Sequence, residues 1–80
     1  MKILYSYEGA RNEVLEQGIL KDIGDRFGAA QQIDAHSGEG GLTTITLALD
    51  DAVSGQDVMA SLESRPDIVE AAQESFGEGA

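Results

Sequence analysis

Cysteine is missing from this 80-residue chain, and basic residues are scarce. Without cysteine there is neither a disulfide framework nor a thiolate metal site, so the fold must depend on its core or on an oligomer interface. Only five Lys and Arg side chains stand against fifteen Asp and Glu, which gives a net charge of −10. Because this charge repels phosphate backbones and anionic lipid surfaces, we expect no direct nucleic-acid binding and no membrane insertion.

Long apolar runs are missing as well. No stretch approaches the roughly 20 residues that a membrane-spanning helix needs, so we expect a soluble, cytoplasmic protein. Hydrophobic residues nevertheless make up 41% of the chain and charged residues 25%, a balance typical of a folded domain. The length is that of a single domain, which we place at residues 1–76, followed by a flexible tail at 77–80.

The first third of the chain predicts a strand followed by a helix. Residues 2–7 include β-branched and aromatic side chains typical of a strand. Between residues 10 and 27 the apolar residues recur at helical spacing, and Gly28 stands where a C-terminal cap is expected. Gly18 and Gly24 inside this helix favour close packing on a sheet. The apolar positions of the helix are Val14, Leu15, Ile19, Leu20, Ile23 and Phe27.

Two further strands are expected in the middle of the chain. Weak alternation over residues 30–36 predicts a half-buried edge strand with Ile33 and Ala35 on its inner side. Residues 37–41 are rich in glycine, which is typical of a hairpin connection. Strict alternation over residues 42–49 then predicts a strand with one face in the core and one in water.

The last third predicts a second helix and a fourth strand. Ser54 followed by Asp57 is similar to a capping box, which indicates a helix from that point to about residue 64. Pro66 ends this helix, since the residue before a proline avoids helical backbone angles. We interpret residues 67–75 as the final strand.

This order of elements defines the expected fold class. Strand, helix, strand, strand, helix, strand is the α+β, ferredoxin-like βαββαβ arrangement, a four-stranded antiparallel sheet with two helices on one face. The second face of the sheet is left open, and it must either accept a partner or be polar enough to meet water. The expected outward positions are polar enough for both.

One group of side chains has metal-ligand chemistry. Asp34 and His36 are two residues apart on a predicted strand, and Glu39 follows in the glycine-rich loop. Imidazole and carboxylate groups bind divalent metals when three or four converge, so this trio is a candidate metal site. An ordinary surface histidine is the alternative. Since no positioned nucleophile accompanies His36, we expect no enzyme and no cofactor.

Several segments together resemble the ACT-like regulatory domains, such as the cytoplasmic C-terminal domain of MgtC-type bacterial membrane proteins. The resemblance is carried by Tyr7-Glu8-Gly9-Ala10 between strand and helix, by Phe27-Gly28 at the helix end, and by Leu62-x-x-x-Pro66-x-Ile68-Val69. It implies a self-associating module that binds a small ligand at the first strand–helix turn. The implied ligand-binding residues are Glu8, Gly9, Ala10, Arg11 and Asn12.

These observations lead to two hypotheses of function. The first is a non-enzymatic regulatory or protein-interaction module that forms a homodimer, senses a small ligand or ion, and acts on a membrane-protein or enzyme partner. The second is a free-standing acidic inhibitor, of the phage anti-defence type, that binds a basic nucleic-acid-handling protein by presenting carboxylates. A surface tuned only for solubility or high salt is the alternative to both. The expected partner-binding residues are Thr44, Thr46, Glu70 and Glu74.

Overall fold

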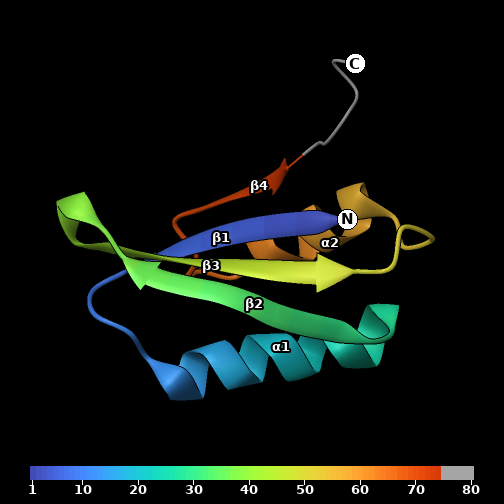
Figure 1. Cartoon of the computed structure of the whole chain (residues 1–80), viewed down its shortest axis with the longest axis horizontal. Coiled ribbons are helices and arrows are strands. Elements are labelled where there is room, and N and C mark those ends of the chain that lie inside the picture. The colour runs from blue at the N-terminus through green and yellow to red at the C-terminus, as the bar shows by residue number, and fades with distance from the viewer. Residues whose placement is uncertain (75–80) are drawn as a thin grey trace.

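The computed structural model describes residues 1–74 of the chain, apart from the side chain of Glu39, so the expected tail at 77–80 and the domain end at 76 lie outside the described residues. Four strands form one sheet in the order β2-β3-β1-β4, and every neighbouring pair is antiparallel (Figure 1). This is the predicted ferredoxin-like α+β fold. The elements are β1 (Lys2–Glu8), α1 (Glu13–Phe27), β2 (Ala30–Ser37), a 3-10 turn (Glu39–Gly41), β3 (Leu42–Leu49), α2 (Gly55–Glu63) and β4 (Glu70–Glu74).

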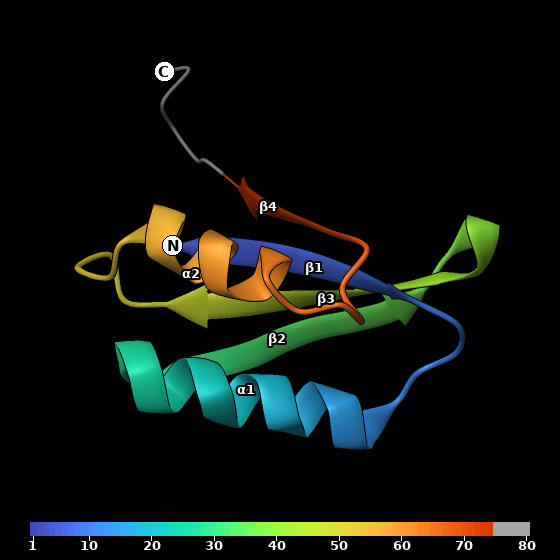
Figure 2. The ribbon, with the colours of Figure 1, turned by 180° about the vertical axis from the view of Figure 1, so that it is seen from behind.

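Both helices cover the same face of the sheet, as Figures 1 and 2 show from opposite sides. Alternate residues of β1 and β3 point toward them, and these residues form the core with the apolar residues of the helices. The core residues are Ile3, Tyr5, Tyr7, Ile19, Ile23, Ile45, Leu47, Leu49, Val58 and Leu62. No helix within residues 1–74 is long and apolar enough to cross a membrane.

Helix α1 begins later than the apolar spacing predicts. The side chain of Asn12 accepts a hydrogen bond of 3.1 Å from the backbone N–H of Leu15, and this cap places the first helical residue at Glu13 instead of Ala10. Val14 was expected in the apolar stripe, but it is 84% exposed. The prediction was wrong there because the capped first turn directs Glu16, and not Val14, toward the sheet.

The two glycines inside α1 do not serve close packing, so that expectation was wrong. A Cβ atom added at Gly18 or Gly24 would find no other atom within 4 Å. The end of the helix does agree with the prediction, because Gly28 has a φ of 101° and its N–H bonds to the carbonyl oxygen of Gly24. The helix therefore ends as predicted, and its glycines face open space.

Strand β2 contains a bulge that changes the expected facing of its side chains. Gln32 is opposite Leu47 and Asp34 is opposite the next residue, Thr46, so Ile33 is an extra residue without a partner. Ile33 is therefore 46% exposed instead of lying in the core, whereas Ala35 does face inward opposite Ile45. Gln32, expected on the outside, points toward α1.

The second half of the chain follows the predicted order with a shorter last strand. The Ser54 side chain caps α2 by accepting a 3.4 Å hydrogen bond from the N–H of Asp57. After this helix the backbone turns, because Ile68 N–H bonds to the carbonyl oxygen of Arg65. Strand β4 consequently starts at Glu70 instead of residue 67.

Candidate functional site

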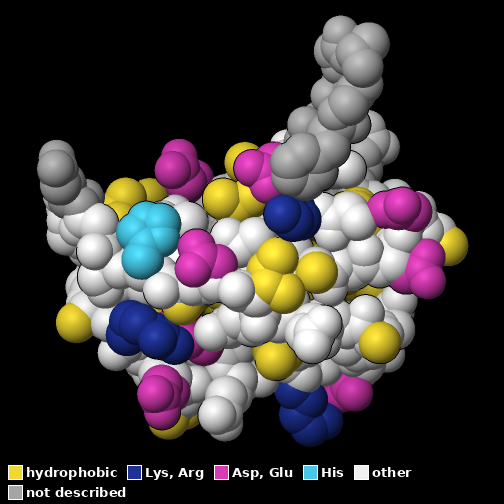
Figure 3. Space-filling view, viewed as in Figure 1, with side chains coloured by type: hydrophobic (Ala, Val, Ile, Leu, Met, Phe, Trp, Pro, Cys, Tyr) yellow, Lys and Arg dark blue, Asp and Glu magenta, His cyan; other side chains and the backbone are white. Residues whose placement is uncertain are grey.

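No described element covers the sheet face opposite the helices (Figures 1 and 2). Its side chains follow from the strand register, and we call these residues the open face. Figure 3 shows it with hydrophobic side chains near the middle and acidic side chains mostly nearer the margin. The open face consists of Gln31, Asp34 and His36 on β2, Leu42, Thr44, Thr46 and Ala48 on β3, Lys2, Leu4, Ser6 and Glu8 on β1, and Glu70, Ala72 and Glu74 on β4.

The side chains in the middle of the open face are uncharged. Thr46 is directly opposite Leu4, and Thr44 is opposite Ser6. The hydroxyl groups of Ser6 and Thr44 lie 3.0 Å apart and share a hydrogen bond, which leaves them less free to bond elsewhere. The centre therefore offers the apolar groups of Leu4 and the threonines together with paired hydroxyls.

The margin of the open face is acidic. Glu70 and Glu74 lie on the edge strand β4, Asp34 lies on the edge strand β2, and Glu8 ends β1, with Lys2 as the basic residue of the face. The four partner-binding residues expected from sequence share this face, Thr44 and Thr46 at its centre and Glu70 and Glu74 at one edge. Their role in binding stays a prediction.

Two of the three predicted metal ligands are neighbours. The Nδ1 atom of His36 lies 3.7 Å from a carboxylate oxygen of Asp34, and each side chain is 64% exposed. Among the described side chains, which do not include that of Glu39, no three His, Asp or Glu groups gather closely enough to hold a metal ion. The metal site, too, stays a prediction.

The β1–α1 loop, where the ligand site was expected, is held by internal hydrogen bonds. The N–H of Gly9 bonds to the carbonyl oxygen of Gly41 at 2.7 Å, and its own carbonyl accepts from the Thr43 hydroxyl at 2.7 Å. The N–H of Asn12 donates to the Tyr7 hydroxyl oxygen at 2.8 Å. These two amides are therefore occupied, and a carboxylate ligand at this turn has to rely on other donors.

A buried carboxylate at the base of this loop was not identified from the sequence. Glu16 is 2% exposed and receives a fork of two hydrogen bonds from Arg11, at 2.6 and 3.2 Å. The Tyr7 hydroxyl donates to it at 2.5 Å, and the amide of Gln32 at 3.2 Å. The network joins β1, the loop, α1 and β2, so it fixes where the loop lies on the sheet.

The same contacts shift the ionisation of the carboxylate and the phenols. Hydrogen bonds from Arg11, and then from Tyr7 and Gln32, lower the pKa of Glu16 to about 2 even though burial opposes this. Burial raises the pKa of Tyr7, and its bond to Glu16 raises it further. Burial likewise raises the pKa of Tyr5, whose hydroxyl is buried without a hydrogen-bond partner in the described part of the chain. Both tyrosine side chains are part of the buried core.

A hollow of about 390 Å³ lies beside this network, between the β1–α1 loop and the turn that precedes β4. We call it the corner hollow. It contains three of the predicted ligand-binding residues, Glu8, Ala10 and Asn12, whereas Arg11 lines a separate, smaller hollow with Glu16. The residues that line the corner hollow are Tyr7, Glu8, Ala10, Asn12, Leu15, Pro66, Asp67 and Val69.

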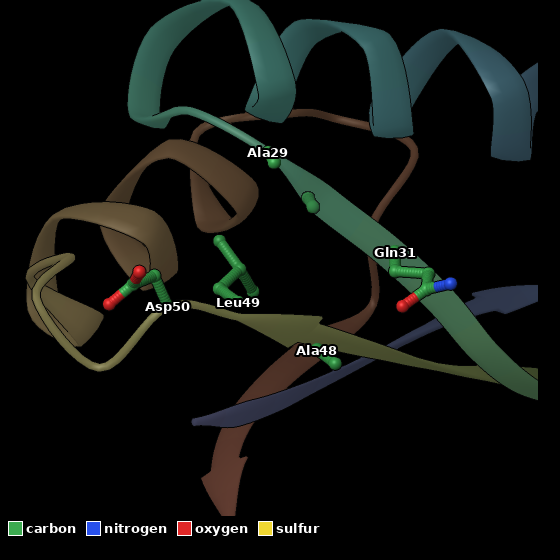
Figure 4. A pocket seen from close by; sticks show the side chains of 6 residues that line it. Ala29, Gln31, Ala48, Leu49 and Asp50 are labelled. Carbon is green, nitrogen blue, oxygen red and sulfur yellow. The ribbon is translucent and has the colours of Figure 1, made fainter.

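A larger hollow, of about 520 Å³, lies at the opposite end of the sheet (Figure 4). Its walls are mostly alanine and Leu49, with Gln31 and Asp50 on two sides. A carboxylate oxygen of Asp50 already accepts a 2.8 Å hydrogen bond from the N–H of Ala52. The lining therefore offers few polar groups that a ligand would need for orientation.

Comparison with protein-family models, with curated proteins and with solved structures finds no match to this chain. The resemblance to ACT-like domains accordingly rests on the sequence pattern alone. The fold itself is shown by the strand order and the placement of the helices.

Proposed function

We propose that this protein is a non-enzymatic protein-interaction module that docks a basic partner protein on its open face. The observation that carries the proposal is an uncovered sheet face with an uncharged centre and an acidic margin. Interfaces commonly combine such a centre, from which water is easily removed, with a charged rim. A rim of one sign also speeds the encounter with a partner of opposite charge.

Charge decides between a basic partner and a second copy on this face. Pairing two copies face to face would bring the carboxylates of Asp34, Glu70 and Glu74 against their counterparts. Like charges brought together at an interface are costly. A partner rich in lysine and arginine meets the same carboxylates favourably, as the acidic-inhibitor hypothesis requires.

The proposal is tested with two variants that each lose two negative charges, one on the open face and one on the helix side. One variant neutralises the open face (Asp34→Asn with Glu70→Gln), and its control neutralises two exposed residues of α2 on the helix side (Asp57→Asn with Glu63→Gln). Both lower the negative charge by two. Binding of an oligo-lysine peptide and an oligo-arginine peptide is measured by calorimetry at low salt, with amide shifts from NMR to locate it.

We expect the open-face variant to bind roughly fivefold more weakly, since each exposed charge pair contributes about 0.2–1 kcal/mol. The α2 variant should bind within about twofold of the unmodified chain, because its charges lie on the other face and are screened. Equal weakening of both variants would show attraction by total charge alone and would overturn the proposal.

Self-association remains a second candidate because of one exposed apolar residue. Ile33 lies on the edge strand β2 and is 46% exposed. Edge strands pair with other chains when their backbone groups are free and their side chains are apolar. A homodimer formed through β2 would show twice the monomer mass in light scattering, and Ile33→Lys would return it to the monomer.

A further inference from the structure

The corner hollow combines apolar walls with carboxylates. Leu15, Pro66 and Val69 supply apolar surface, and Tyr7 supplies a ring. Glu8 and Asp67 supply the negative charge. A volume of about 390 Å³ lies within the range of roughly 300–1,000 Å³ typical of binding pockets, so a single long side chain can enter it.

The two carboxylates are not equally free. Within residues 1–74 Glu8 takes part in none of the described ion pairs, and it is exposed. An oxygen of Asp67 lies 3.5 Å from Nε of Arg65, and the Asp67 side chain is 43% exposed. Arg65 also lies 3.7 Å from Asp22, so it is shared between two acids. The hollow therefore retains unbalanced negative charge.

We infer that the corner hollow binds an arginine side chain of the basic partner. The guanidinium group is planar, carries several donors and is more weakly hydrated than an ammonium group, so it suits two separated carboxylates and an apolar wall better than lysine does. Glu8 belongs both to the hollow and to the open face, so a partner on that face can reach the hollow. The identity of this occupant rests on the proposed function.

The inference is tested with side-chain analogues. N-Butylguanidinium is titrated into the labelled protein and the amide shifts are followed by NMR. N-Butylurea, which has a similar shape and no charge, is the ligand control. We expect saturable shifts at Ala10, Asn12 and Val69 with the guanidinium compound and at least roughly fivefold weaker binding of the urea.

Two variants locate the binding. Val69→Lys puts a cation at the wall of the hollow and should weaken binding of the guanidinium compound at least roughly tenfold, while the fold persists because Val69 is 53% exposed. Glu8→Gln removes the free carboxylate and should weaken binding of the guanidinium compound less, by roughly threefold. Neither change alters the uncharged centre of the open face.

Binding that does not saturate, that is equal for the urea compound, or that survives Val69→Lys would overturn the inference. Failure of the proposed function gives a different result. If guanidinium binding persists but the open-face variant binds the basic peptides as well as its α2 control does, docking on the open face is wrong and the arginine site stands. If the peptide test succeeds and the guanidinium test fails, only the arginine site is wrong.

Discussion

Glu16 is a charged residue placed where charge is normally costly. Removing a carboxylate from water disfavours its ionised form unless hydrogen bonds and an opposite charge replace the lost hydration. Arg11, Tyr7 and Gln32 together supply four such hydrogen bonds. The ionised side chain therefore locks the β1–α1 loop to the sheet, and removing its charge takes away one acceptor oxygen and the opposite charge that Arg11 faces.

We predict that Glu16→Gln lowers the free energy of unfolding at neutral pH and that this loss shrinks in acid. The folded-state pKa of Glu16 is about 2, below its ordinary value of 4.5, so the charge stabilises the fold fully above pH ~4.5 and progressively less as pH falls toward 2. The difference between these two pKa values corresponds to about 3 kcal/mol in the free energy of unfolding. Urea unfolding at about pH 7 and pH 3 measures it.

Glu13→Gln is the matched control, since Glu13 lies exposed in the same helical turn. Its stability should differ from that of the unmodified chain by about 0.5 kcal/mol or less. If the deficit of Glu16→Gln is as large at about pH 3 as at pH 7, the charge of Glu16 is not the source of the stabilisation.

At the scale of structural elements, glycine is unfavourable for stability in helix α1 and favourable in the loop before it. A Cβ at Gly18 would meet no atom within 4 Å, and neither would one at Gly9, but Gly9 has a φ of +97°. We predict that Gly18→Ala raises the free energy of unfolding by about 0.5–1 kcal/mol, because alanine has the higher helix propensity. Gly9→Ala should lower it by about 1–2 kcal/mol, because a side chain strains that backbone.

Thermal unfolding of the two alanine variants, monitored by circular dichroism, checks this pair. Because space around the two positions is equally open, steric crowding cannot account for opposite effects. A loss of stability in Gly18→Ala would instead mean that the helix makes contacts at Gly18 that the described residues do not show.

Sequence periodicity predicted the elements well where one face of an element is uniformly apolar. Strand β3 is the clearest case, because its side chains alternate strictly between buried and half-buried positions. Strand β2 was harder to predict, since a single extra residue, Ile33, changes which side chains face inward. Nothing in the local pattern marks that bulge, because its position depends on pairing with β3.

The buried hydrogen-bond network of Glu16 could not be predicted from the sequence for a related reason. Tyr7, Arg11, Glu16 and Gln32 come from four consecutive segments, and only the folded sheet brings them together. A glutamate in the first turn of a helix is ordinarily explained by the helix dipole and solvent. The useful signal was the cap, because placing Asn12 at the N-cap puts Glu16 one turn further along, on the inner side of α1.

At the scale of the whole molecule, acidic groups far outnumber the cations that can neutralise them. Arg11, Lys21, Arg26 and Arg65 each already pair with an acid of the same chain. The five Lys and Arg side chains are therefore too few to pair one-to-one with the fifteen carboxylates of the chain. Such an excess repels itself in the compact state, and it also attracts a basic partner.

We predict that sodium chloride stabilises this protein. Raising ionic strength from low salt to about 1 M shortens the screening length to about 3 Å, which weakens repulsion among exposed carboxylates more than it weakens the short contacts of the buried Glu16. If salt raises the free energy of unfolding by about 1 kcal/mol, the melting temperature measured by calorimetry rises by about 4–8 °C. The variant Asp57→Asn with Glu63→Gln has less charge to screen and should gain less. A melting temperature that falls with salt would show that the surface ion pairs, such as Lys21 with Asp25, outweigh the repulsion. If the melting temperature of the variant rises as much as that of the unmodified chain, the cause is a general effect of salt on burial.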